Sequence, residues 1–74
     1  MIAEKVTFID QFSAPYGKDI KLENVAYENG ARVLRIHIRE GRRFTVMDID
    51  EHTASHWSAV MKAWAKQSIQ PTAR

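Results

Sequence analysis

The chain contains no cysteine, so neither disulfide bridges nor thiolate-bound metals can stabilise it. Its three glycines, Gly17, Gly30 and Gly41, lie far apart, which excludes a glycine-rich phosphate-binding loop. No apolar run approaches the roughly 20 residues of a membrane span, and the N-terminal residues lack the apolar core of a signal peptide. We therefore expect a cytoplasmic protein with no membrane association and no cofactor.

The length of 74 residues allows one small domain, which we place at residues 1–68, followed by a flexible tail at residues 69–74. A chain of this size buries only about 60% of the surface of its unfolded form, so one core supplies little stability. Hydrophobic residues nevertheless make up 45% of the sequence. Since disulfides and thiolate-bound metals are excluded, oligomerisation is the remaining ordinary means of stabilisation. The composition therefore predicts a homodimer.

Four segments are rich in strand-forming residues: residues 4–12, 18–28, 31–39 and 42–49. Asn29-Gly30 is the strongest hairpin signal and predicts a two-residue loop. With that loop the apolar residues of the second segment would point to different faces of the sheet. A β-bulge near residues 23–24 would bring them to one face, and we therefore expect one there. A second two-residue loop at Glu40-Gly41 would place Arg35 opposite Val46 and His37 opposite Phe44.

The last segment has the signature of a helix over about residues 51–66, with Asp50 as its N-cap. Apolar residues recur there at helical spacing and predict one buried stripe. The sequence thus predicts an α+β fold, in which a four-stranded antiparallel β-meander is followed by one C-terminal α-helix packed on the sheet. The expected core lies between Trp57 and Trp64 of the helix and Leu34, Ile36, Ile38 and Met47 of the sheet.

Basic residues and one aromatic residue gather on the third and fourth strands. Cationic grooves with aromatic rings bind single-stranded nucleic acid, because the cations follow the phosphates and the bases stack on the rings. We therefore predict a site for single-stranded DNA or RNA. An acidic protein partner docking on the same face is the alternative, and a solvated face paired with Glu23, Glu28 and Asp48 is the plainest interpretation. The predicted nucleic-acid-binding residues are Arg35, His37, Arg39, Arg42, Arg43 and Phe44.

Residues with catalytic or metal-binding potential are few. His52 and His56 have the i, i+4 spacing of two metal ligands on a helix, but Thr53 stands where a metalloprotease needs glutamate. Both fall on the polar side of the helix, so we expect solvent-facing histidines and no metal site. The serines lack the local pattern of a nucleophile. We expect the protein not to be an enzyme.

The segment GARVLRIHIREGRRFTVMDIDEHTASHWSAVMKAWA carries two resemblances. Over about residues 17–66 the chain resembles a family of small uncharacterised bacterial proteins marked by an REGRRFT-type hairpin and a helix with tryptophan. More weakly, the strand end Ile38-Arg39-Glu40, the basic hairpin and the capped helix resemble the positive cofactor four transcriptional coactivators. The second resemblance implies four strands and a helix, a dimer, and binding of single-stranded DNA.

Overall fold

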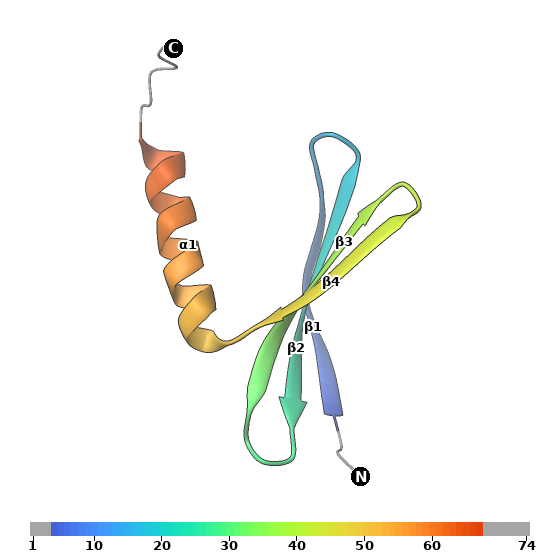
Figure 1. Ribbon diagram of the computed structural model, residues 1–74, viewed down its shortest axis with the longest axis vertical. Helices are drawn as coiled ribbons and strands as arrows, with labels where there is room; N and C mark the ends of the chain where they lie inside the picture. Colours follow the sequence, from blue (N-terminus) through green and yellow to red (C-terminus); the bar gives the residue numbers. More distant parts are fainter. Residues whose placement is uncertain (1–3, 68–74) are drawn as a thin grey trace.

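The computed structural model describes residues 4–67, which form four strands followed by one helix (Figure 1). The elements are β1 (Glu4–Ala14), β2 (Lys18–Tyr27), β3 (Arg32–Glu40), β4 (Arg43–Ile49) and α1 (Glu51–Lys66). The strands make a single antiparallel sheet in the order β1-β2-β3-β4. The predicted fold class is confirmed, and β1 is longer than expected because it continues to Ala14. The predicted tail at residues 69–74 lies outside the described residues.

Residues 28–31 separate β2 from β3, and the hydrogen bond between Tyr27 and Ala31 leaves a loop of three residues, 28–30. The predicted two-residue loop is therefore wrong. The amide of Tyr27 donates to the carbonyl of Ala31 at 2.9 Å, and Gly30 has a φ of +90° that favours glycine. The third loop residue restores the apolar phase, because Leu22 pairs with Ile36 as expected without any bulge in β2. The bulge instead lies in β1, between Phe8 and Asp10.

The β3–β4 hairpin turns at Gly41 and Arg42, one residue later than predicted. Gly41 has a φ of +63°, which suits the first position of a tight hairpin loop. The pairing is consequently displaced by two residues from the predicted register: Arg35 lies opposite Asp48, not Val46, and His37 lies opposite Val46, not Phe44. Because side chains alternate between faces with period two, this displacement keeps every side chain on its expected face.

The sheet has two faces of different character. What we call the apolar face carries mostly aliphatic residues, and α1 lies on this side. What we call the charged face carries cations and carboxylates at its centre, between apolar residues of β1 and β4. The apolar face includes Ile9, Phe12, Ile20, Leu22, Leu34, Ile36, Ile38, Met47 and Ile49. The charged face includes Glu4, Asp19, Lys21, Glu23, Arg35, His37, Arg39, Phe44, Val46 and Asp48.

Helix α1 has the predicted bounds, and the side chain of Asp50 accepts a hydrogen bond from the amide of Thr53 at 2.8 Å, which confirms the N-cap. The helix contacts β3 but does not lie across the sheet (Figure 1). Ala54 is its only residue that is not exposed, whereas Trp57 is 40% and Trp64 69% exposed. In the single chain the two tryptophans therefore do not cover the predicted core, and the sequence left open whether the helix packs on its own sheet or on that of a partner.

Few apolar side chains are buried as a result. Within residues 4–67 only Val25, Ile36 and Ile49 form the buried hydrophobic core. The radius of gyration is 15.6 Å, whereas a compact chain of this length has a value of about 11 Å. A single chain thus leaves much of its apolar surface in contact with water.

Candidate functional site

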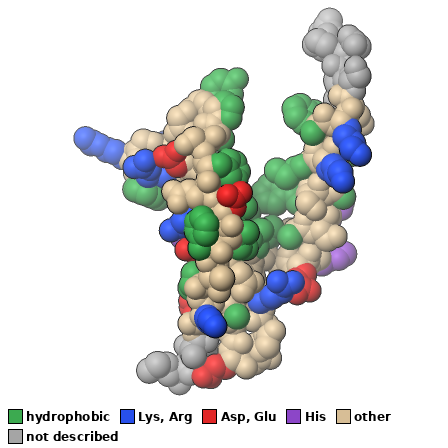
Figure 2. Space-filling view, turned by 180° about the vertical axis from the view of Figure 1, so that it is seen from behind, with side chains coloured by type: hydrophobic (Ala, Val, Ile, Leu, Met, Phe, Trp, Pro, Cys, Tyr) green, Lys and Arg blue, Asp and Glu red, His purple; other side chains and the backbone are tan. Residues whose placement is uncertain are grey.

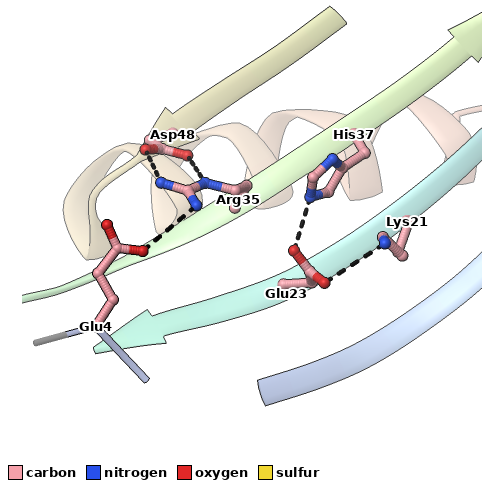
Figure 3. A network of polar contacts seen from close by, with 6 residues as sticks. All are labelled: Glu4, Lys21, Glu23, Arg35, His37 and Asp48. Carbon is pink, nitrogen blue, oxygen red and sulfur yellow. Dashed lines mark hydrogen bonds and ion pairs between the residues drawn. The ribbon is translucent and has the colours of Figure 1, made fainter. Parts of the chain in front are cut away.

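The predicted site begins with Arg35 at the centre of the charged face. Its Nε donates to Asp48 Oδ1 at 2.9 Å and its Nη2 to Asp48 Oδ2 at 3.0 Å, so the pair is bidentate (Figure 3). Glu4 of β1 adds a third contact, with its Oε1 at 3.8 Å from Nη1. The hydrogen bonds from Arg35 hold the pKa of Asp48 below its usual value, and Asp48 raises the pKa of Arg35. Two carboxylates, Asp48 of β4 and Glu4 of β1, therefore balance the charge of Arg35.

His37 has an equally close carboxylate. Its Nε2 lies 2.7 Å from Oε1 of Glu23, and Lys21 Nζ lies 3.5 Å from the other oxygen of the same carboxylate (Figure 3). The hydrogen bond with His37 is the main cause of a lowered pKa at Glu23, and the charge of Lys21 adds to it. One carboxylate of β2 thus serves two basic side chains.

Arg39 repeats this arrangement near the hairpin end. Its Nη2 donates to Oδ2 of Asp19 at 2.7 Å, and the hydroxyl of Ser13 donates to the other oxygen at 2.9 Å. These two hydrogen bonds, that from Arg39 first, lower the pKa of Asp19. Each basic residue predicted on strand β3 is therefore paired with an acid on an adjacent strand.

The structure brings together only part of the predicted site. Arg35, His37, Arg39 and Phe44 share the charged face, and the Phe44 ring is 70% exposed opposite Arg39. Arg42 lies in the loop, and Arg43 is on the apolar side of the sheet by its pairing with Glu40. The contact between Arg35 and Asp48 agrees with the interpretation of a face paired with acids. Glu23 pairs with His37 rather than with an arginine, and Asp19 was not named as a partner of Arg39. Basic and acidic side chains therefore alternate on the charged face, which is not a basic surface.

The histidines of α1 remain apart from this network. His52 and His56 are exposed, as expected for solvent-facing residues. Among residues 4–67 no group of three or more His, Asp or Glu side chains is placed to hold a metal ion. At the start of the helix, Nε of Arg32 lies 2.6 Å from Oε2 of Glu51, which connects α1 to β3. Glu51 therefore anchors the first turn of α1 to the sheet.

Apolar residues of the sheet and of α1 form a second candidate surface, which includes Met47, Trp57 and Trp64 of the predicted core. A hollow of about 260 Å³ separates the beginning of α1 from the sheet, lined among others by Leu34, Ile49 and Ala54. Figure 2 shows hydrophobic side chains on both sides of the space between the helix and the sheet. Sequence reasoning recognised these residues as apolar but not as exposed, because periodicity does not show what covers a stripe. The exposed members are Ile9, Phe12, Met47, Trp57, Val60, Met61 and Trp64.

Comparison with known proteins gives a family and no activity. In the described part of the chain no helix has the length and hydrophobicity needed to cross a membrane. No curated protein and no solved structure matches the sequence. The model of a family of unknown function, DUF6967, matches residues 3–67, which agrees with the resemblance to small uncharacterised proteins. The chain belongs to the DUF6967 family.

Proposed function

We propose that this protein is a non-enzymatic interaction subunit that works as a homodimer, and that the apolar face of the sheet and the apolar stripe of α1 form its interaction surface. One observation carries the proposal: in the single chain the stripe is exposed to water, and the apolar face exposes Ile9, Phe12 and Met47. The stripe consists of Trp57, Val60, Met61 and Trp64, whose exposed fractions lie between 40% and 69%.

The exposed apolar area is comparable to the largest apolar patch of a typical monomer. At about 250 Å² for a tryptophan side chain, Trp57 and Trp64 alone expose roughly 270 Å². The largest apolar patch on a typical monomer is about 300–600 Å² in total. Val60, Met61 and Met47 extend the surface further, since each is at least 37% exposed. A stable interface needs about 800 Å² from each partner, and this surface offers a large apolar part of that area.

The charged face gives less support to the alternatives based on arginine. A polyanion, whether nucleic acid or an acidic protein, would have to displace Asp48 from Arg35 and Asp19 from Arg39. It would also meet the charges of Glu4 and the other carboxylates on the same face. Affinity for polyanions depends on unpaired cations that release counterions, and these cations are paired. Asp19, His37 and Arg39 line a hollow of about 270 Å³ on this face. Each of the three is already paired with an opposite charge, which favours a non-enzymatic role.

Sedimentation equilibrium over a dilution series from high to low micromolar concentration tests the proposal. We expect a dimer that dissociates on dilution, together with a red shift of tryptophan emission, because both tryptophans lie on the stripe. A monomer at every concentration, with emission that does not change, would remove the homodimer.

Binding of single-stranded nucleic acid remains a second candidate, at the tip of the β3–β4 hairpin. Within residues 4–67 Arg42 and Arg43 form no ion pair, and Phe44 next to them is exposed. Fluorescence anisotropy with labelled oligonucleotides at increasing salt concentration tests this function. The logarithm of the binding constant falls linearly with the logarithm of the salt concentration. Arg42→Ala and Arg43→Ala should each make this slope less steep by about one unit, because each removes a cation that can neutralise one phosphate. Lys66→Ala, on the helix, is the matched control, and the absence of salt-sensitive binding would exclude the function.

A further inference from the structure

The connection between β4 and α1 decides where the helix can lie. Asp50 is the only residue between the two elements. Its carboxylate caps the helix, Ile49 before it is buried, and Glu51 after it is paired with Arg32 of β3. This short joint keeps the first turn against β3 and directs the rest of the helix away from the sheet (Figure 1). The apolar stripe starts at Trp57, beyond the anchored first turn, and therefore extends away from its own sheet.

The two exposed surfaces match in size. The stripe from Trp57 to Trp64 extends about 10 Å along the helix at 1.5 Å per residue. On the apolar face, Leu34 to Ile38 of β3 extend about 13 Å at 3.3 Å per residue. Both surfaces have polar borders, since Ser55 and Lys62 are on the opposite side of the helix and the charged residues are on the other face of the sheet. Each is thus a suitable cover for the other.

Both complementary surfaces belong to the same chain, which is the condition for a symmetric dimer. In a twofold arrangement, any contact that the first copy makes with the second is made again in the reverse direction. If one helix covers the sheet of the partner, the partner's helix covers the first sheet by the same operation. Two chains then bury both sheets and both stripes, and no surface is left to extend into a chain of subunits.

We propose that the occupant of the apolar face is helix α1 of a second copy of this chain, so that Trp57 and Trp64 of each protomer pack against the exposed Met47 and the half-buried Leu34 and Ile38 of its partner. This inference rests on the proposed homodimer and specifies its contacts. Apolar area is its main support: the helix exposes all of its stripe, and the sheet exposes Ile9, Phe12 and Met47 around half-buried residues.

The absence of cysteine makes a direct test possible, because introduced cysteines have no native competitors. The double variant Met47→Cys/Met61→Cys carries one thiol on the apolar face and one on the stripe. We expect oxidation, or reaction with a short bismaleimide, to give covalent dimers in denaturing gels. An equimolar refolded mixture of the two single variants should give the same mixed cross-link. Met47→Cys combined with Lys62→Cys is the control, which places the helical thiol on the polar side and should react much more slowly.

Other products would identify other arrangements. Cross-linked monomers from the double variant would show that each helix covers its own sheet. Cross-links confined to Met47→Cys alone would show sheets packed face to face. If the unmodified chain is a dimer, either result refutes the proposal that each helix covers the sheet of the partner. If the unmodified chain is a monomer, the proposed function itself is refuted. Thr45→Cys with Met61→Cys repeats the test at a second position of the apolar face, in case the first pair prevents folding.

Discussion

Replacing Trp64 with alanine should weaken the proposed homodimer strongly without unfolding the helix. Trp64 is 69% exposed in the single chain, which corresponds to roughly 170 Å² of a side chain of about 250 Å². At about 25 cal/mol per Å², complete burial of that area in the dimer would contribute roughly 4 kcal/mol per chain. If half of the area is buried, each chain loses about 2 kcal/mol and the symmetric dimer about 4 kcal/mol. The expected increase in Kd is therefore roughly 1000-fold, because about 1.4 kcal/mol corresponds to a factor of ten.

The measurement is Kd from sedimentation equilibrium, together with far-ultraviolet circular dichroism of the same samples. Alanine is the best helix former, so the helical signal of the isolated chain should not decrease through propensity. Lys62→Ala is the matched control, since Lys62 is on the opposite side of α1 from the stripe. Its Kd should stay within about fivefold of the unmodified value, as expected for a surface change in both copies. A change of less than about tenfold for Trp64→Ala would contradict burial of the stripe in the dimer.

Three further changes test the fold of the chain itself. Val25→Ala removes two methyl groups from a fully buried side chain, and thermal unfolding should show a loss of about 2 kcal/mol. Gly30→Ala places a Cβ at a φ of +90°, which should cost about 1–2 kcal/mol in the same assay although no atom obstructs the methyl group. The lowered pKa values of Asp19, Glu23 and Asp48 predict acid sensitivity. Their contribution to the stability of the fold is fully present above the usual pKa values of 3.8 for Asp and 4.5 for Glu. It is lost as the pH falls through the lower pKa values that these groups have in the folded state. Urea unfolding at a series of pH values should show this loss, and Asp48→Asn should reduce it; an unchanged pH profile would argue against the paired charges.

Local signals in the sequence were sufficient for the order and the ends of the elements. Helix α1 was predicted with its bounds because an Asp N-cap and a regular apolar spacing both act within a few residues. The loops were predicted less well, since one loop residue more or less changes strand pairing without changing the hydrophobic pattern. Gly30 marked the first hairpin correctly, but its loop has three residues, and the expected bulge in β2 lies instead in β1.

The sequence could not predict what covers the apolar surfaces, for a different reason. The stripe with Trp57 and Trp64 predicts that something packs on it, and the same pattern would result from a sheet of the same chain or of another. The joint at Asp50 determines the direction of the helix, and this direction is a property of three-dimensional geometry. The basic residues posed the same difficulty: Arg35 and Arg39 were correctly assigned to one face, but their acidic partners depend on strand register.

The charged pairs explain how this sheet selects its register. A slip of one residue would turn the apolar side chains to the opposite face, so hydrophobicity opposes it. A slip of two residues keeps every side chain on its face, so hydrophobicity discriminates against it only weakly. In the observed register Arg35 makes two hydrogen bonds to Asp48, whereas the register displaced by two residues would place Val46 opposite Arg35. Cross-strand pairs of opposite charge stabilise a sheet, so the displaced register lacks a contribution that the observed one has. The arginines of the charged face therefore have a structural role in strand pairing.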